Sequence, residues 1–269
     1  MGTLRSLADF ARAVPWLVRP GTVVFRRFSR ALGDNLLLSH LAREWKRRHP
    51  RSRVVLETNW PELFEGNPNV DLAVRSKIAP RYRKPRYRIG KETRTHILDQ
   101  LAESVGLPRS ADRRVEMFLT PGEVHAVTRD LPQRYVVVCP VGKRTVAANR
   151  KDWGMERFQA VVDRCSATAF VQIGTPGDPL LRGVIDRRGL PIRASAAVLA
   201  GARRALVLEG GLMHLARAVG THAVVIYGGA VAPEVSAYPE HTNLVVRAPC
   251  GPCFRSHGRL EDCPTMDCT

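Results

Sequence analysis

The chain has 269 residues, of which 44% are hydrophobic, and a formal net charge of +17 from 42 Lys and Arg against 25 Asp and Glu. This length allows two domains, the composition excludes a disordered or fibrous protein, and no apolar run reaches the roughly 20 residues that a transmembrane helix needs. The excess of positive charge favours anionic partners such as nucleic acid, acidic lipid or phosphorylated small molecules, or it reflects arginines spread over solvated faces.

The N-terminal segment, residues 1–20, has the pattern of a basic amphipathic helix. It lacks the continuous apolar stretch and the small-residue cleavage site of a secretory signal, so we expect a cytoplasmic protein. A basic helix of this kind is suited to peripheral contact with an anionic membrane, here the inner face of the plasma membrane. Its apolar face contains Leu4, Leu7, Phe10, Ala11 and Val14.

The segment 21–130 alternates strand and helix patterns, which is typical of a parallel sheet. A basic loop at 75–94 interleaves tyrosines with Arg and Lys, as a loop that contacts nucleic acid or phosphorylated lipid does. Strands are predicted at 21–29, 52–58, 67–74 and 114–119, and helices within 33–50, 93–107 and 120–134.

The segment 134–248 continues this alternation and predicts a doubly wound α/β domain, which the Cys-rich tail 249–269 follows. In such folds ligands bind at the carboxyl ends of the strands, so the turns that follow the strands are the candidate sites. Strands are predicted at 135–142, 169–174, 205–210 and 222–229, and helices at 155–165, 180–189, 195–203 and 212–220.

One of these turns, Glu-Gly-Gly-Leu-Met-His from Glu209 to His214, joins a strand to a helix. Gly210 and Gly211 remove Cβ atoms where the chain bends and let a ligand approach the backbone closely. The first N–H groups of the helix favour an anion such as a pyrophosphate. His214 could add a hydrogen bond to that phosphate, and Glu209 could accept one from a sugar hydroxyl. The alternative is an ordinary turn without a ligand, because the G-x-G-x-x-G pattern is missing.

Cysteines are concentrated in the last twenty residues, which hold four of the six. The other two, Cys139 and Cys165, lie in apolar contexts and are expected to be buried. Four thiolates at this spacing could bind a structural zinc or iron, with His257 as a substitute ligand. Two disulfides or free structural cysteines are the alternatives, although a cytoplasmic chain is in a reducing compartment. The candidate ligands are Cys250, Cys253, Cys263 and Cys268.

Several motifs together resemble glycosyltransferase family nine, the bacterial ADP-heptose:lipopolysaccharide heptosyltransferases and their relatives. The motifs are the segment 206–229, "GDNLLLSHLAREWKRRHP" with "LFEGNPNVD", "NRKDWGMERF" and "CGPC", and they follow the family's order from about residue 22 to the end of the chain. This resemblance implies a GT-B fold, in which two Rossmann-like domains face across a cleft. It also implies an inverting, metal-independent sugar transfer from a nucleotide-activated donor.

The sequence departs from the family at two places. The family's turn usually reads Asp-Ser/Thr-Gly-x-x-His, so Glu209 replaces an aspartate and Gly210 a hydroxyl residue, and the donor could differ from ADP-heptose. The first domain is shortened around 75–95, so part of the acceptor site could come from another subunit of a homo-oligomer, or the acceptor could be small.

The resemblance also implies roles for single residues. Asp34 aligns with the family's Gly-Asp motif, whose aspartate is thought to be the general base toward the acceptor hydroxyl; otherwise it only complements the dipole of its helix. Lys151 matches a lysine that contacts the donor phosphates and would stabilise the departing nucleoside diphosphate. By their position after the strand at 135–142, and not by the resemblance, Lys143 and Arg144 are supporting candidates, or they form a solvated basic turn. Gly174 begins a turn that could frame the base or ribose, or that is an ordinary turn.

We therefore expect a glycosyltransferase that moves a sugar, such as a heptose, from a nucleoside-diphosphate sugar to a hydroxyl of a saccharide or lipid-linked glycan. A non-catalytic sugar-nucleotide-binding or assembly subunit is the first alternative, and it would tolerate Asp34→Asn. A nucleic-acid-binding protein that uses the basic loop is the second, and its affinity should fall steeply with salt. The sequence contains no recognised nucleic-acid-binding module.

Overall fold

The structure is a computed structural model that describes residues 9, 11, 14–17, 19–27, 29–90, 92–143, 149–253, 263 and 264. The chain forms two compact units. The first contains Met1–Tyr87 and Ile97–Phe118, and the second contains Arg88–His96 and Leu119–Thr269. The units therefore meet in the sequence at 118/119, whereas the pattern analysis divided the chain between 130 and 134. Within the described residues, no helix is both long enough and apolar enough to cross a membrane.

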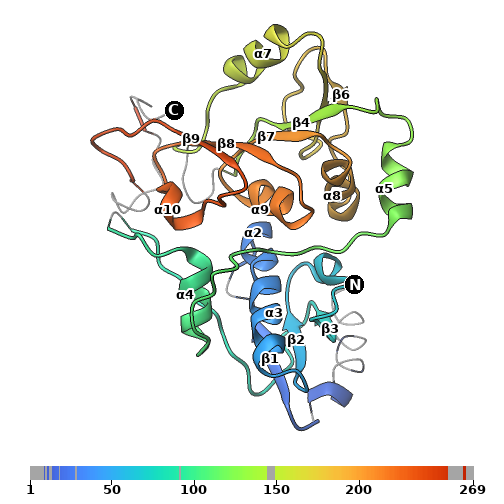
Figure 1. Cartoon of the computed structure of the whole chain (residues 1–269), viewed down its shortest axis with the longest axis vertical. Helices are drawn as coiled ribbons and strands as arrows, with labels where there is room; N and C mark the ends of the chain where they lie inside the picture. The colour runs from blue at the N-terminus through green and yellow to red at the C-terminus, as the bar shows by residue number, and fades with distance from the viewer. Residues whose placement is uncertain are drawn as a thin grey trace. The chain divides into compact units, whose positions relative to one another are not determined.

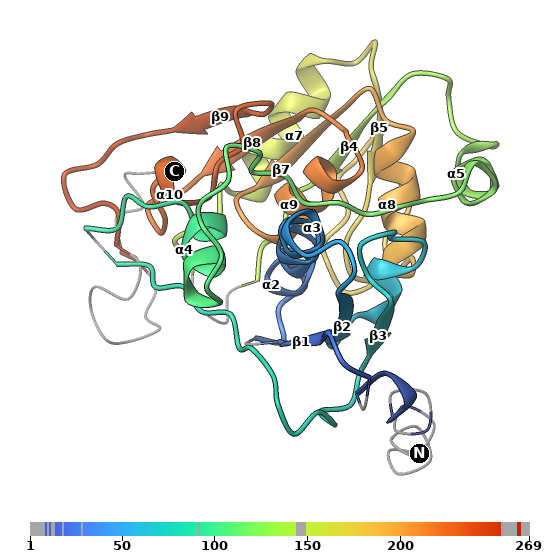
Figure 2. The same ribbon diagram turned by 60° about the horizontal axis from the view of Figure 1, so that its bottom comes forward.

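The first unit is built on a three-stranded parallel sheet. Its strands are β1 (Thr22–Arg26), β2 (Arg53–Glu57) and β3 (Leu72–Val74), in that order, and its helices are α2 (Leu32–Leu36), α3 (Leu38–Arg48), α4 (Ile97–Ser104) and the 3-10 helix η1 (Pro61–Phe64). Helix α3 packs against β2 and α4 (Figures 1 and 2). Valines of all three strands form an apolar cluster, against which Trp16, Leu17 and Ile78 pack.

The helix predicted within 33–50 is interrupted at Leu37 and forms α2 and α3 instead. The hydroxyl of Ser39 donates to the carbonyl of Leu36 at 2.7 Å. A serine hydroxyl that takes the carbonyl three residues earlier competes with the helical hydrogen bonds and bends the helix. Both helices carry the apolar face that the sequence pattern predicts. The pattern did not predict the break at Leu37.

The strand predicted at 114–119 is wrong, because side chains of α3 take the hydrogen bonds that a sheet would need. Arg43 donates to the backbone carbonyls of Asp112 and Arg114, at 2.8 and 3.1 Å. The backbone N–H of Glu116 donates to the hydroxyl of Ser39 at 2.9 Å. These residues have no regular secondary structure and pair with no strand among the described residues.

The second unit contains a six-stranded, fully parallel sheet. Its strands are β4 (Tyr135–Cys139), β5 (Ala169–Gln172), β6 (Ile185–Asp186), β7 (Arg204–Leu208), β8 (Ala223–Tyr227) and β9 (Thr242–Val245). They lie in the order β6-β5-β4-β7-β8-β9. Counted within the unit this is 3-2-1-4-5-6, the Rossmann order, and it confirms the predicted doubly wound α/β fold.

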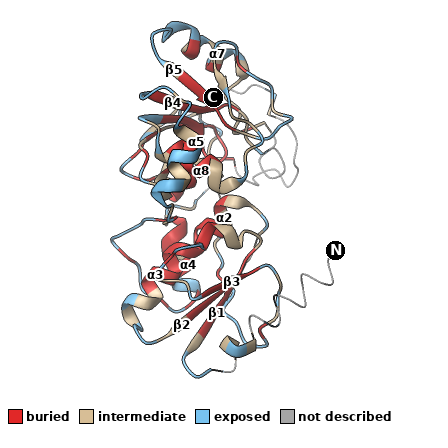
Figure 3. Ribbon diagram, turned by 90° about the vertical axis from the view of Figure 1, so that its right-hand side faces the viewer, coloured by how far each residue is buried: buried red, intermediate tan, exposed pale blue. Residues whose placement is uncertain are grey.

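Helices cover both faces of this sheet. They are α5 (Pro121–Thr128), α7 (Met155–Arg164), α8 (Ile192–Ala200), α9 (Gly211–Ala218) and the short α10 (Pro233–Ser236). Figure 1 shows α7 on one face and α8 with α9 on the other. Under α7, Phe158 and Val162 pack on buried side chains of β4, β7 and β8. Strand β2 of the first unit and strands β4, β5, β7 and β8 of the second are buried along most of their length (Figure 3).

Two local predictions for the second unit differ from the structure, and one strand was not predicted. The helix predicted at 180–189 is a loop with the edge strand β6, because Gly183 and Gly189 have φ of +72° and +78°, which a right-handed helix excludes. Strand β9 was not predicted, since its side chains alternate between exposed and half-buried and carry little apolar signal. Cys165 is exposed at the end of α7, whereas Cys139 is buried as expected.

The unit boundary at 118/119 follows from the packing of α5. This helix was assigned to the first domain from the sequence, but it packs against α8 of the second unit. The guanidinium of Arg193 on α8 forms a bidentate ion pair with Glu123 on α5, at 2.6 and 2.9 Å. Charge pairing and helix packing therefore attach α5 to the six-stranded sheet.

Candidate functional site

The carboxyl ends of β4 and β7 lie next to each other at the centre of the six-stranded sheet. The chain leaves β4 toward α7 on one face and leaves β7 toward α9 on the other (Figure 1). In doubly wound folds a ligand binds where the strand order reverses in this way. The structure brings five of the predicted donor-binding residues together here: Lys151, Glu209, Gly210, Gly211 and His214.

The N-terminus of α9 is not capped. Gly210 precedes the helix with φ +147°, a conformation that L side chains rarely adopt, and no described side chain hydrogen-bonds to the end of the helix. A Cβ added at Gly210 would meet no described atom within 4 Å. The first N–H groups of an α-helix have no intrahelical acceptor, and the helix dipole adds positive potential. Such a terminus can bind a phosphate or another anion.

Lys151 and Glu209 form an ion pair beside this terminus. Glu209 is buried and continues the sheet, since its N–H donates to Ile226 O at 2.9 Å. Lys151 reaches it from the loop after β4, which passes close to the end of β8. A Cβ on Gly228 would come within 2.1 Å of Arg150 O, so only glycine allows this approach. The cation predicted to contact phosphate is therefore held at the helix terminus by a carboxylate.

His214 lies one turn into α9 and is buried. Its Nδ1 is 2.7 Å from the hydroxyl of Tyr238. Burial lowers the pKa of His214 to about 3, with smaller contributions from the charges of His96, Lys151 and His241. The imidazole is therefore neutral at physiological pH, so it can donate a hydrogen bond to a phosphate but cannot act as a cation.

The remaining donor-binding candidates lie elsewhere or outside the described residues. The turn at Gly174 is closed internally: Asp178 accepts from the N–H and hydroxyl of Thr175, both at 2.7 Å, and its carboxylate fills the space that a side chain on Gly174 would need. The donor-binding role of Gly174 stays a prediction. Lys143 is exposed after β4, and Arg144 lies outside the described residues.

Asp34, the candidate base, lies in the first unit, in the first turn of α2. It is half-buried and accepts a hydrogen bond from the hydroxyl of Tyr87 at 2.7 Å. Tyr87 comes from the basic loop 75–94, so this loop contributes directly to the surroundings of Asp34. No sequence pattern links the two residues, because 53 positions separate them.

Two arginines of the basic loop 75–94 have partners within the first unit. Arg75 forms an ion pair with Glu62, at 2.8 Å. Arg83 donates to Val105 O, also at 2.8 Å, and lies over the ring of Trp45. Part of the positive charge therefore stabilises the first unit itself, whereas Lys77, Arg81, Lys84 and Arg86 are exposed.

The Cys-rich tail is attached to the second unit at two points. The N–H of Cys253 donates to Gly229 O at 2.7 Å, just after β8. The side chain of Asn149 makes two hydrogen bonds with the backbone of Cys263, at 2.6 and 3.0 Å. Within the described part of the chain, no three His, Cys, Asp or Glu side chains form a metal-binding group. Cys268 and His257 lie outside it, so the four-cysteine site is untested.

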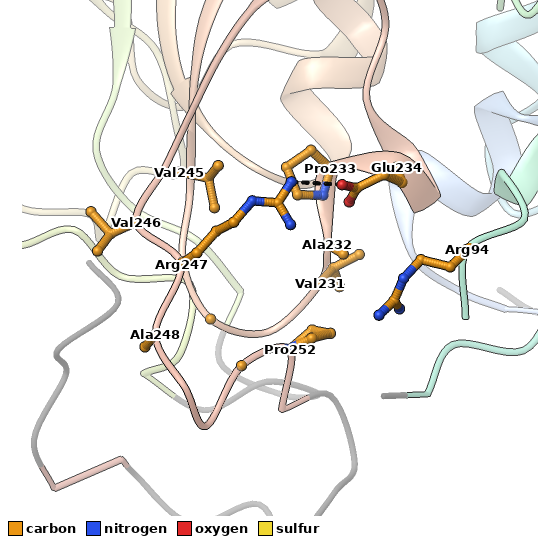
Figure 4. A pocket seen from close by; sticks show the side chains of 13 residues that line it. Arg94, Val231, Ala232, Pro233, Glu234, Val245, Val246, Arg247, Ala248 and Pro252 are labelled. Atoms are coloured by element: carbon orange, nitrogen blue, oxygen red, sulfur yellow. Dashed lines mark hydrogen bonds and ion pairs between the residues drawn. The ribbon is translucent and has the colours of Figure 1, made fainter. Parts of the chain in front are cut away.

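A pocket lies at the carboxyl ends of β8 and β9. It has a volume of about 200 Å³. Apolar side chains such as Val245 and Pro252 line it, together with Arg94 and the Arg247–Glu234 ion pair at 2.6 Å (Figure 4). It belongs to the second unit but is lined by none of the predicted donor-binding residues.

No family model matches the sequence, and a comparison with curated proteins finds no match. The structure is nevertheless similar to solved glycosyltransferases of family 9. A family 9 glycosyltransferase from Veillonella parvula is 17% identical, with a TM-score of 0.67 over 83% of this chain and 86% of that one. The ADP-heptose lipopolysaccharide heptosyltransferase II of E. coli is 14% identical, with a TM-score of 0.66 over 85% and 92%.

A third similar structure is the iron-containing dodecameric glycosyltransferase TibC of enterotoxigenic E. coli. It is 18% identical, with a TM-score of 0.69 over 91% of this chain and 69% of that one. At these identities the likeness concerns the fold. The resemblance to family 9 that the sequence motifs indicate is thereby confirmed for the fold.

Proposed function

We propose that the chain is an inverting glycosyltransferase of the GT-B type that uses a nucleoside-diphosphate sugar. The observation that carries this proposal is the uncapped N-terminus of α9, with Lys151 beside it, at the point where the Rossmann sheet reverses its strand order. This arrangement offers backbone N–H groups and one ammonium to a diphosphate. The family 9 fold agrees with such a donor.

The proposed reaction is a single displacement at the anomeric carbon of the donor sugar. The acceptor hydroxyl oxygen forms the new bond to this carbon, and the bond from the carbon to the diphosphate oxygen breaks. Asp34 takes the hydroxyl proton, which requires a carboxylate within hydrogen-bond reach. The leaving diphosphate gains negative charge, which Lys151 and the N–H groups at Gly210 and Gly211 stabilise. No catalytic metal is needed for these steps.

ADP-heptose is the first donor to test. A TibC structure of the same fold was determined in complex with ADP-D-β-D-heptose, and two other similar structures are E. coli heptosyltransferases. We propose a saccharide or lipid-linked glycan as the acceptor. The replacement of the family's aspartate and hydroxyl residue by Glu209 and Gly210 makes other nucleoside-diphosphate sugars necessary members of the test panel.

The decisive experiment measures release of the nucleoside diphosphate from a panel of donors, with saccharide and lipid-linked acceptors, for the wild type and Asp34→Asn. General-base catalysis contributes about 10²- to 10⁴-fold, so we expect a loss of that size in the variant with unchanged donor binding. Asp112→Asn removes an exposed carboxylate of the same unit and is the matched control. Binding without turnover, unaffected by Asp34→Asn, would instead indicate a sugar-nucleotide-binding subunit.

A structural metal in the tail is a separate part of the proposal. Cys250, Cys253, Cys263 and Cys268 supply soft thiolate ligands, which suit zinc or iron, and TibC is an iron-containing enzyme of the same fold. The attachment of Cys253 and Cys263 to the second unit supports a structural role for the metal. Elemental analysis of the purified chain tests this: about one equivalent of zinc or iron, lost in Cys253→Ser, is expected.

Oligomerisation and membrane contact complete the proposal. TibC is a dodecamer, and a homo-oligomer of this chain would be detected by light scattering. We place the protein in the cytoplasm, where the exposed cations of the basic loop 75–94 would contact anionic lipid. Co-sedimentation with vesicles that contain anionic lipid, compared with neutral vesicles, tests the second statement, and binding that fails to decrease with salt would contradict it.

A further inference from the structure

Tyr238 lies behind the candidate donor site in the second unit, between α10 and β9. Its side chain is fully buried, and its ring meets the imidazole of His214 edge-on, with the centroids 5.5 Å apart. The hydroxyl oxygen is 2.7 Å from Nδ1 of His214. Sequence patterns give no sign of this contact, because 24 positions separate the two residues.

The position of Tyr238 is fixed by its surroundings. Its backbone carbonyl accepts hydrogen bonds from the N–H of His241 and from the side chain of Asn243, both at 3.1 Å. The rings of His96 and His241 meet its ring edge-on, at centroid distances of 6.1 and 5.6 Å. These contacts fix the position of the Tyr238 hydroxyl, so the protonation of the His214 imidazole has to match the hydrogen bond that this hydroxyl makes.

The direction of this hydrogen bond follows from the number of available partners. Within the described part of the chain, the imidazole of His214 is the only hydrogen-bond partner of the Tyr238 hydroxyl. A buried hydroxyl hydrogen that finds no acceptor costs about 1–3 kcal/mol. Tyr238 therefore donates to Nδ1, and Nδ1 carries no proton. The imidazole is neutral, so its single proton is on Nε2.

The Nε2–H group is suited to the anion site at the start of α9. Side chains of a helix lean toward its N-terminus, and His214 lies one turn from the uncapped residues Gly210 and Gly211. The other tautomer would present a lone pair to a phosphate, and two acceptors repel each other. Only the tautomer that Tyr238 selects can donate to a phosphate oxygen.

We propose that Tyr238 is a positioning residue that holds His214 in its Nε2–H tautomer, so that the imidazole donates to the diphosphate of the donor. This inference rests on the proposed function for the identity of the ligand. The hydrogen bond itself exists without a ligand, so the two parts can be tested separately.

The first test needs no ligand. Long-range 1H–15N correlation spectra of the imidazoles distinguish the two tautomers. The signals of His214 are those present in the spectrum of the wild type and absent from that of His214→Gln. In the wild type we expect a proton on Nε2 and an unprotonated Nδ1. In Tyr238→Phe, which keeps the buried ring and removes only the hydroxyl, both tautomers are populated and the two 15N shifts move toward each other. Unchanged shifts in Tyr238→Phe, or a proton on Nδ1 in the wild type, overturn the proposal.

The second test measures the Kd of ADP by calorimetry. When the two tautomers are about equally populated in Tyr238→Phe, only about half of the molecules can donate to the diphosphate, so the Kd should rise about twofold. His214→Gln places an amide N–H near the position of Nε2 and does not depend on Tyr238. In that background, Tyr238→Phe should therefore leave the Kd unchanged.

Tyr135→Phe is the matched control. Tyr135 is another buried tyrosine of the second unit, and its hydroxyl donates to Val198 O at 2.7 Å. It should change neither the tautomer nor the Kd. A changed tautomer with an unchanged Kd in Tyr238→Phe overturns donation to the diphosphate. A wild type that binds no nucleotide counts against the proposed function, whereas the spectra still decide whether Tyr238 positions His214.

Discussion

Two helices of the second unit, α5 and α9, are both eight residues long but begin in opposite ways. α5 begins with a complete capping box: the Thr120 hydroxyl accepts from the N–H of Glu123, and the Glu123 carboxylate accepts from the N–H of Thr120. α9 begins after Gly210, which has no side chain to accept a hydrogen bond. In α5 the chain satisfies its own donors, whereas in α9 it leaves them for another molecule.

The difference teaches where to look for a ligand in a doubly wound fold. A capping box stabilises a helix by about 1 kcal/mol, so a helix that lacks one gives up stability at its first turn. α9 lacks a cap where the strand order reverses, and α5 has one where it only packs on α8. An anion-binding site needs an uncapped helix N-terminus, and α9 has one where the strand order reverses.

The largest expected effect comes from making the start of α9 resemble that of α5. Gly210→Asp places a carboxylate at the helix terminus, which satisfies the dipole and repels a diphosphate. The repulsion should raise the Kd of ADP about 100-fold by calorimetry, whereas the unfavourable φ costs about 1–3 kcal/mol of folding stability in the free and the bound protein alike. Gly210→Ala carries the strain without the charge, so it should lower stability and change the Kd much less. Equal effects of the two variants would show that the terminus does not bind an anion.

Removal of the cation beside α9 should have the next largest effect. Lys151→Met keeps most of the side-chain volume and removes one charge-assisted contact, which corresponds to about a tenfold rise in the Kd of ADP. The dependence of binding on salt should also weaken. Arg164→Met removes an exposed cation at the end of α7 and should leave the Kd unchanged. Equal Kd values for Lys151→Met and the wild type would exclude Lys151 from the donor site.

Removal of the cap of α5 should change stability but not binding. Thr120→Ala removes the side chain that accepts from the Glu123 N–H, at a cost of about 1 kcal/mol. Urea unfolding of the second unit should show this loss, while ADP binding stays as in the wild type. A change in the Kd of ADP would contradict the division of roles between the two helices.

The smallest effect concerns the other half of the capping box and depends on pH. Hydrogen bonds from Arg193, and then from Thr120, lower the pKa of Glu123 to about 2. The pKa is lower in the folded than in the unfolded state, so this stabilisation is complete above about pH 4.5 and is lost as the pH falls toward 2. Glu123→Gln should therefore destabilise by roughly 0.5 kcal/mol at pH 7 and by less at pH 3, by urea unfolding. A difference that grows on acidification would contradict this origin.

Much of the second unit could be predicted because its strands are short β-branched runs that end in glycine or charged turns. β4 and β8 are examples, and the glycine pair after β7 indicates the proposed anion site without knowledge of the fold. A single sequence could not show that Ser39 and Arg43 bind the backbone at 112–116, so a plausible strand pattern there was wrong.

The sequence could not predict the hydrogen-bond partners of the site residues either. Tyr87 at Asp34, Tyr238 at His214 and Asn149 at Cys263 all act across distant parts of the chain. Motifs identify the residues that would contact the substrate, because these follow strands at fixed places. The side chains that orient them are selected by packing, which leaves no periodic pattern.

The short segment Arg88–His96 makes the second unit discontinuous in sequence, since residues of the first unit lie on both sides of it. Its last residue, His96, is buried and lies 3.2 Å from Ala237 O with Nε2. A fragment that starts at Leu119 would contain every strand of the six-stranded sheet but would lack this buried imidazole and leave a hole beside Tyr238. The chain therefore has no single cut that separates the units intact, and a dissection would have to graft these nine residues onto the C-terminal fragment.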